Sequence, residues 1–377
     1  MSEFSLSKAF LKSQKNRVPN FGFNGLGELV YLRTYSRVKE NGEKEEWWET
    51  CKRVVEWVYN TQKEHIERQR LGWDNKKAQA SAQEMYERIF DMKFLPPGRG
   101  LWIAGTDVLK TKPVAAALNN CGMTTTENID VDPVSPFIFL MDMSMLGVGV
   151  GFDTKGAGKV TIYNPKESAE TIVIEDSREG WVDALKSLIE SYFVEGKSKV
   201  EFDYSQIRKY GEPIKGFGGV ASGYEPLKEL LDNIKSQFEG RAGELVTSED
   251  IVNIMNRIGV CVVSGNVRRT AEIAFGDYRD KSYMKLKDYR YNAETGQYEG
   301  SRADRASYGW TSNNSIFAEV GMNYDEIGEQ IAMNGEPGIA WLENIKNYSR
   351  MNTAPDYKDH RVVGSNPCIL TFCAFCK

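Results

Sequence analysis

The feature of this sequence that most limits its fold is the alternation, from about residue 96 onward, of helical and extended patterns. Two helices are expected from apolar residues three to four apart, at Leu227, Leu230, Leu231, Ile234 and Phe238 and at Ile251, Ile254, Met255, Ile258 and Val262. Residues 159–163, 171–174, 200–204, 271–275 and 338–342 have extended patterns. Helices that alternate with strands indicate an α/β fold.

The first 95 residues differ from the rest of the chain because their patterns are helical. Trp47, Cys51, Val54, Val55 and Val58 fall on one helical face. A second helical pattern ends before Pro96-Pro97-Gly98, since proline cannot continue a helix. The sequence therefore predicts an N-terminal helical region of residues 1–95.

Composition excludes several classes of partner. The chain has 53 acidic and 48 basic side chains, so a broad cationic surface for nucleic acid is not expected. No run of eighteen apolar residues and no secretory leader occur, which predicts a cytoplasmic protein without a membrane segment. With two histidines and six irregularly spaced cysteines, we expect thiols, no disulfide framework and no metal site.

Two short motifs are open to more than one interpretation. The segment Gly147-Val-Gly-Val-Gly151 could bring backbone close to a phosphate, but a tight turn from helix to strand is the commoner use of such glycines. Arg268 and Arg269 lie between a helix end and a strand. Their guanidinium groups suit phosphate or base contacts, although a basic pair in a loop is usually only solvated.

The cysteines divide by their surroundings. Cys51 and Cys261 fall within apolar helical patterns and are predicted to be core residues. Cys121 and Cys368 lie beside Asn, Gly or Pro in loop sequences, where a thiol can meet a substrate. Asp176 is predicted to cap the helix that follows it, with a glutamate three residues later.

Eight separated segments, in one order, give the chain a family resemblance. They are FLPPGRGLWIAGTD, ALNNCG, DSREGW, IRKYGEPIKGFGG, SGNVRRTAEIAFGD, WTSNNS, NGEPGI and GSNPC. Together they resemble the monomeric class II ribonucleotide reductases, which are adenosylcobalamin-dependent ribonucleoside-triphosphate reductases. The resemblance covers roughly residues 94–368, and eight collinear motifs are not expected by chance. DSREGW and GNVRRTAEI favour this class over a class I or a diphosphate-using reductase.

The resemblance implies an incomplete ten-stranded α/β barrel, with an N-terminal helical region and an effector-binding insertion. In the family two five-stranded parallel halves surround a finger loop, which corresponds here to residues 365–368. Adenosylcobalamin supplies a radical that oxidises the cysteine matching Cys368, and the thiyl then abstracts the 3′ hydrogen of the ribonucleotide. The expected domains are residues 1–95, the first barrel part 96–175, the insertion 176–265, the barrel continuation 266–368 and an unrelated tail 369–377.

The resemblance also implies roles for individual residues. Cys121 matches a cysteine that supplies reducing equivalents, and Asn366 matches an asparagine that hydrogen-bonds the ribose. Asn120 and Ser365 are expected to contact substrate. The residues expected at the effector site and the specificity loop are Asp176, Ser177, Arg208, Gly265, Asn266, Arg268 and Arg269. The implied partners are a ribonucleoside triphosphate, a deoxynucleoside triphosphate effector and a thioredoxin-like reductant, for a monomeric enzyme.

The sequence departs from the family directly after Cys368. The family has Gly-Glu there, with the glutamate as general base, whereas this chain has Ile369 and Leu370, which cannot accept a proton. By comparison with the family, this sequence also lacks the second reducing cysteine, the remaining barrel strands with most of the cobalamin-binding surface, and the terminal cysteine pair. We therefore expect the chain alone to be poorly soluble and inactive. The alternative is a nucleotide-binding module without catalysis.

Overall fold

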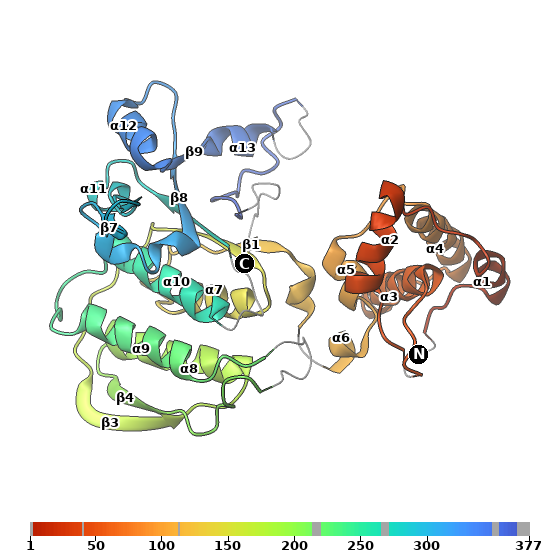
Figure 1. Ribbon diagram of the computed structural model, residues 1–377, viewed down its shortest axis with the longest axis horizontal. Coiled ribbons are helices and arrows are strands. Elements are labelled where there is room, and N and C mark those ends of the chain that lie inside the picture. Colours follow the sequence, from red (N-terminus) through yellow and green to blue (C-terminus); the bar gives the residue numbers. More distant parts are fainter. Residues whose placement is uncertain are drawn as a thin grey trace. The chain divides into compact units, whose positions relative to one another are not determined.

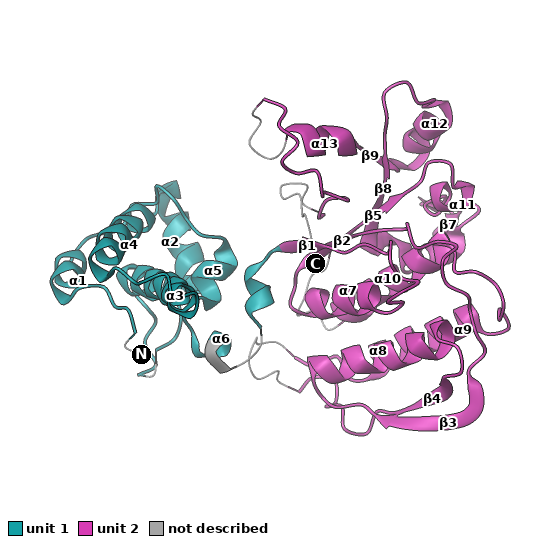
Figure 2. Cartoon of the chain, turned by 180° about the vertical axis from the view of Figure 1, so that it is seen from behind, with its two compact units in different colours: residues 1–120 teal, residues 121–377 magenta. Residues whose placement is uncertain are grey.

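A computed structural model describes residues 3–39, 41–111, 114–212, 220–264, 271–348 and 354–367. The chain forms two compact units, residues 1–120 and 121–377 (Figure 2). The division into five segments expected from the sequence remains a prediction.

The first unit is helical, and its core lies around two long helices (Figure 1). Its elements are α1 (Lys8–Gln14), η1 (Phe23–Gly25), α2 (Leu26–Val30), η2 (Tyr31–Tyr35), α3 (Trp47–Arg68), α4 (Asn75–Phe90), α5 (Gly98–Ile103), α6 (Asp107–Thr111) and η3 (Ala115–Leu118). Helix α4 begins where the Asp74 carboxylate accepts hydrogen bonds from two backbone N–H groups. Cys51 is buried between these helices, as the sequence predicted.

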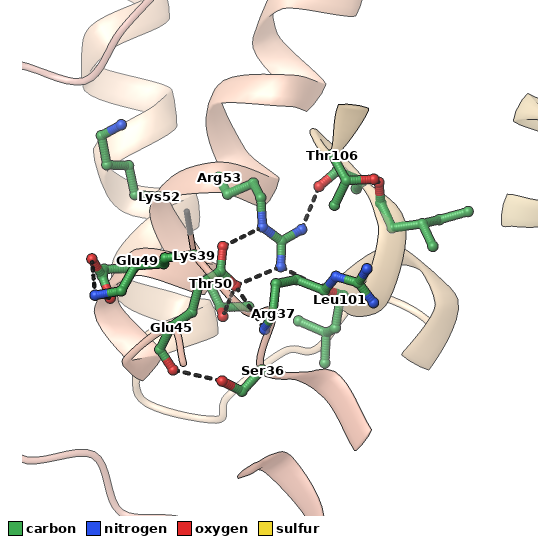
Figure 3. A network of polar contacts seen from close by, with 12 residues as sticks. Ser36, Arg37, Lys39, Glu45, Glu49, Thr50, Lys52, Arg53, Leu101 and Thr106 are labelled. Carbon is green, nitrogen blue, oxygen red and sulfur yellow. Dashed lines mark hydrogen bonds and ion pairs between the residues drawn. The ribbon is translucent and has the colours of Figure 1, made fainter. Parts of the chain in front are cut away.

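A polar network joins the start of α3 to the end of α5 (Figure 3). The Glu45 carboxylate accepts hydrogen bonds from Arg53 Nε at 2.7 Å and from Thr50 Oγ1 at 2.8 Å. Arg53 also donates to the carbonyl oxygens of Leu101, at 2.9 Å, and Ala104. These carbonyls lie at the carboxyl end of α5, so Arg53 satisfies acceptors that the helix itself leaves open.

The second unit is built on a parallel sheet. Its strand order is β1-β2-β5-β8-β9, and every neighbouring pair is parallel. The strands are β1 (Cys121–Met123), β2 (Gly149–Asp153), β5 (Glu272–Gly276), β8 (Ser312–Phe317) and β9 (Gly338–Ala340). Parallel neighbours joined by helices confirm the predicted α/β class. Five parallel strands match one half of the barrel that the resemblance implied.

Helices and a second small sheet form further layers over one face of the main sheet. Helices α7 (Ser135–Met145) and α10 (Ser248–Val263) pack on β2 and β5, and α8 (Arg178–Phe193) and α9 (Glu225–Phe238) pack on α7 and α10 (Figure 1). Strand β4 (Ser198–Asp203) pairs with β3 (Lys166–Val173) and packs on α8. The buried apolar faces of α9 and α10 are those predicted from their spacing.

The remaining elements follow β5 and β8. They are α11 (Lys281–Met284), β6 (Arg290–Asn292), β7 (Gln297–Glu299), η4 (Ala303–Arg305), η5 (Gly309–Thr311), α12 (Asp325–Asn334) and α13 (Leu342–Tyr348). Strands β6 and β7 form an antiparallel hairpin.

The strand predicted at residues 159–163 is wrong. This segment forms only an isolated bridge, between Thr161 and Leu245. Its backbone instead exchanges irregular hydrogen bonds with residues 243–246, for example from the Val246 N–H to the Val160 carbonyl oxygen. An alternating pattern alone could not distinguish such a segment from a strand.

Candidate active site and effector site

The Cys121 thiol lies at the amino-terminal end of β1, the first strand in the order of the parallel sheet. Cys121 is the first residue of β1 and is half-buried, and the exposed Asn120 directly precedes it. In the register Cys121 lies beside Gly149 of the neighbouring strand. Gly122 faces the other way, toward Phe139 of α7. The thiol is therefore on the sheet face opposite the helices.

Glycines in β2 let a second segment approach this thiol. A methyl group built on Gly149 would lie 3.4 Å from Pro367 Cγ and 3.6 Å from Cys121 Sγ. A methyl group on Gly151 would overlap the carbonyl oxygen of Ser365. The loop of residues 364–367, which we call the finger segment, therefore lies directly on the backbone of β2.

The turn interpretation of the glycine-rich motif is confirmed for Gly147. Gly147 has φ of 76°, in the left-handed region, and connects the end of α7 to β2. Gly151 serves a different purpose, because it lies inside the strand and leaves space for the finger segment. Spacing within the motif could not reveal this, since residues 364–367 are more than two hundred positions away.

The finger segment is closely packed. Ser365 and Asn366 are 2% and 1% exposed. Beneath it lies an apolar floor of Met123, Ile273 and Phe275, against which Val363 and Phe317 also pack. The Phe275 and Phe317 rings are stacked with centroids 4.9 Å apart. The fold thus brings Cys121 to the segment that contains two other predicted site residues.

The other two described cysteines are unsuited to thiolate chemistry. Both Cys51 and Cys261 are buried, and burial raises the pKa of Cys261 to about 12 and that of Cys51 well above its usual value. Their prediction as core residues is confirmed. Among the described residues, Cys121 is the cysteine that lies at a partly open position.

The predicted effector residues lie together at the start of α8. Arg208 Nε donates a hydrogen bond of 2.6 Å to the Asp176 carboxylate, and both side chains are about one-third exposed. Ser177 Oγ accepts a hydrogen bond of 2.9 Å from the Gly180 N–H. A paired carboxylate and guanidinium beside a helix amino end form a polar site suited to a hydroxyl and an anion.

The predicted capping role of Asp176 is wrong by one residue. Ser177 is the N-cap of α8, and the Asp176 carboxylate is bound instead by Arg208. An Asp-Ser pair offers two possible caps in sequence, and the distant arginine decides between them. The neighbouring Arg178 donates to Asp142 of α7. Helix α7 leads into β2, the strand on which the finger segment lies. The ion pair between Arg178 and Asp142 therefore links the start of α8, where the effector residues lie, to the helix that precedes β2.

Several predicted residues lie outside the described part of the chain. They are Cys368 and, in the expected specificity loop, Gly265, Asn266, Arg268 and Arg269.

Sequence reasoning missed a buried polar cluster on the helix side of the sheet. Asn256 of α10 donates to Glu272 Oε2 at 3.1 Å and to Ser312 Oγ at 2.9 Å. Arg305, fully buried, donates to the Asn256 side chain at 3.2 Å. Burial raises the pKa of Glu272 to about 8, although the Asn256 hydrogen bond opposes this. The sequence feature that could have revealed this cluster is the pair of asparagines, Asn253 and Asn256, within the apolar pattern of α10.

The cluster explains two motifs to which the sequence had assigned no role. WTSNNS supplies the buried side chains of Thr311, Ser312 and Asn314. NGEPGI supplies Glu336, which accepts a hydrogen bond of 2.8 Å from the Asn314 N–H and lies 3.7 Å from Lys287 Nζ. These two motifs therefore meet around the start of β8.

Two family models match the chain. The ribonucleotide reductase alpha domain matches residues 6–106, and the B12-dependent ribonucleotide reductase insertion domain matches residues 153–238. A probable adenosylcobalamin-dependent ribonucleoside-triphosphate reductase of Dictyostelium discoideum is 51% identical over 98% of this chain and 50% of its own length. The adenosylcobalamin-dependent ribonucleoside-triphosphate reductase of Euglena gracilis is 48% identical over 97% of this chain and 49% of its length.

A solved structure agrees with these relatives. The crystal structure of a B12-dependent (class II) ribonucleotide reductase matches with a TM-score of 0.80 and 29% identity, over 97% of this chain and 56% of that one. The fold built on the five-stranded parallel sheet is thus that of a class II ribonucleotide reductase. The chain belongs to the adenosylcobalamin-dependent, class II family of these enzymes. It spans about half the length of the curated relatives it matches.

Proposed function

We propose that the protein acts in the reduction of ribonucleoside triphosphates to 2′-deoxyribonucleoside triphosphates, with adenosylcobalamin as cofactor. The observation that carries this proposal is that Pro367 and the Cys121 thiol lie on the same side of one glycine, Gly149, where a methyl group would be within 3.6 Å of both. The finger segment, whose next residue is Cys368, therefore lies near a thiol that can deliver electrons. The relatives whose names state this activity supply the substrate and cofactor class.

In this proposal each residue of the site has a distinct task. The Cys121 thiol supplies reducing equivalents as the 2′ hydroxyl leaves as water, and forms a disulfide with a second thiol. The Asn366 amide hydrogen-bonds the ribose, and Ser365 and Asn120 contact the substrate. Cys368 carries the thiyl that removes the 3′ hydrogen.

The described residues suit radical chemistry. Bound adenosylcobalamin would supply the carbon radical that oxidises a cysteine. The apolar floor of Met123, Ile273 and Phe275 keeps water from the side of the finger segment that packs on the sheet, which suits radical chemistry. No described residue is assigned to hold the corrin ring.

Asp176, Ser177 and Arg208 form the proposed site for a deoxynucleoside triphosphate effector. Arg208 would meet the phosphates, and Asp176 would accept a hydrogen bond from the deoxyribose hydroxyl. Gly265, Asn266, Arg268 and Arg269 are the proposed specificity loop between effector and substrate. A thioredoxin-like protein is the proposed reductant, and the whole enzyme is proposed to be a monomer in the cytoplasm. Among the described residues no helix is long and apolar enough to cross a membrane.

A second function is favoured by one observation. Ile369 and Leu370 stand where the family has Gly-Glu, so the chain as given has no carboxylate beside Cys368 to accept the 3′ hydroxyl proton. The second candidate function is therefore that of a nucleotide-binding module, which binds deoxynucleotide effectors but does not reduce a substrate.

One pair of measurements separates the two functions. Calorimetry with dTTP reports effector binding, and an assay with ATP or CTP, adenosylcobalamin and dithiothreitol reports deoxynucleotide formation. Binding together with turnover that Cys121→Ser abolishes supports the reductase, whereas binding without turnover supports the second function. If the chain neither binds dTTP nor forms a deoxynucleotide, both are wrong.

A further inference from the structure

Asn313, in the WTSNNS motif, lies on the opposite side of β8 from its buried neighbours. Ser312 and Asn314 are 0% and 3% exposed and belong to the polar cluster under α10, whereas Asn313 is exposed. Alternate residues of a strand face opposite sides of the sheet. Asn313 therefore faces away from the helices.

The register places Asn313 on the face that carries the finger segment. Asn313 lies beside Ile273, Ile273 beside Gly151, and Gly151 beside Met123. These residues form one row across four strands. Met123 and Ile273 are buried in the apolar floor, and Asn313 is the polar, exposed end of that row.

The side chain of Asn313 is available for a ligand. It forms no hydrogen bond with the described residues, although the side chains on either side of it in β8 do. An amide on an otherwise apolar row can offer both a donor and an acceptor to a bound molecule.

The backbone around Asn313 is held firmly. Lys287 Nζ donates to the Ser312 carbonyl oxygen at 2.5 Å, and the Asn314 N–H donates to Glu336 at 2.8 Å. The Tyr283 hydroxyl donates to the Ser315 carbonyl oxygen at 2.8 Å. Buried and half-buried side chains thus fix β8 on both sides of Asn313, which is the rigid support that a recognition residue requires.

Distance decides which part of a nucleotide Asn313 can reach. Three strand spacings separate β1 from β8, so Asn313 lies about 14 Å across the sheet from Met123, its row partner in β1, and farther from Cys121. That is too far for the ribose carbon that receives the electrons. One neutral amide beside Ile273 is a poor phosphate site, whereas an amide pairs well with the polar edge of a base.

We infer that Asn313 hydrogen-bonds the nucleobase of the ribonucleoside triphosphate whose ribose lies at Cys121. This inference rests on the proposed function and adds a specificity-determining residue to that site. The amide presents a donor and an acceptor, so it can serve a purine or a pyrimidine edge.

The test follows occupancy of the Cys121 site in the full 377-residue chain. Iodoacetamide alkylates Cys121, and mass spectrometry of the peptide that carries it gives the rate at increasing ATP or CTP. We expect both nucleotides to slow alkylation. Asn313→Ala should raise their half-protecting concentrations about tenfold, the loss of roughly 1.4 kcal/mol of hydrogen bonding. The affinity for dTTP, bound elsewhere, should stay unchanged.

Two further variants separate base contact from a structural effect. Asn128→Ala, at an exposed position beyond the carboxyl end of β1, is the matched control and should behave as the wild type. Asn313→Asp keeps acceptors but loses the donor, so it should change the ratio of the ATP and CTP values. If Asn313→Ala equals the control, or if Asn313→Asp affects both nucleotides equally, the inference is overturned and the proposed function stands. If neither nucleotide protects wild-type Cys121, the proposed function fails and the inference fails with it.

Discussion

Gly151 of β2 and Ser365 are in direct backbone contact, because a methyl group at Gly151 would overlap the Ser365 carbonyl oxygen. At Gly149 the approach is looser, since a methyl group there would lie 3.4 Å from Pro367 Cγ, an ordinary contact distance. Gly151 thus leaves a groove over β2, and the finger segment lies in it beside Cys121. The segment can take this position because Gly151 has no side chain.

Gly151→Ala should displace the finger segment. The added methyl group meets backbone, which cannot move as a flexible side chain does, so we expect destabilisation of about 1 to 3 kcal/mol. Thermal unfolding measures this loss, and hydrogen exchange should show weaker protection near residue 365. The control is Gly328→Ala in α12, where nothing lies within 4 Å of the new methyl group. Equal stability of the two variants would contradict the groove.

Arg208→Ala should weaken effector binding. It removes the guanidinium that pairs with Asp176 at 2.6 Å and is proposed to meet the phosphates. We expect the dissociation constant for dTTP, measured by calorimetry, to rise about tenfold or more. Arg290→Ala, at an exposed position in the β6–β7 hairpin, is the control. Unchanged affinity in Arg208→Ala would place the effector elsewhere.

The Glu45–Arg53 pair should stabilise the N-terminal unit. Both side chains are nearly buried, at 10% and 13% exposure, so Arg53→Ala leaves a carboxylate without its main partner. We expect a loss of about 3 kcal/mol in the free energy of unfolding, measured with urea. Lys52→Ala, which removes the more exposed pair with Glu56, should cost less than about 1 kcal/mol.

The same pair should make stability depend on pH. Burial alone would raise the pKa of Glu45, but hydrogen bonds from Arg53 and Thr50 outweigh it and lower the pKa below 4.5. A lowered folded-state pKa gives stability that is present above the unfolded value and is lost as pH falls through the folded one. Glu45→Gln should remove this loss below about pH 4.5. A wild-type stability that stays flat there would contradict the assignment.

Glu272 should give the opposite dependence of stability on pH. Burial raises its pKa from 4.5 to about 8, so its contribution is complete below pH 4.5 and is lost as pH rises through 8. Unfolding in urea between pH 5 and 9 should show this decline, and Glu272→Gln should reduce it. Glu326→Gln, at an exposed position in the first turn of α12, should leave the decline intact. The same slope in both variants would exclude Glu272 as its origin.

Much of the fold followed from local patterns. The apolar spacing of α9 and α10 predicted their buried faces, since a helix repeats every 3.6 residues whatever it packs against. The prediction of a strand at residues 159–163 was wrong because an alternating pattern does not specify a pairing partner. The prediction of Asp176 as the N-cap was wrong because Arg208, thirty-two residues later, binds its carboxylate.

The sequence by itself determined the family, the α/β class and the candidates Cys121, Asn366, Asp176 and Arg208, because these depend on motif order and residue chemistry. Only the tertiary structure decided that Gly151 leaves a groove for residues 364–367, and that Asn313 lies on the same sheet face as this groove while Asn314 faces the buried cluster. The physical reason is that strand register and backbone contact join residues far apart in the chain. Such contacts leave no periodic signal in either segment alone.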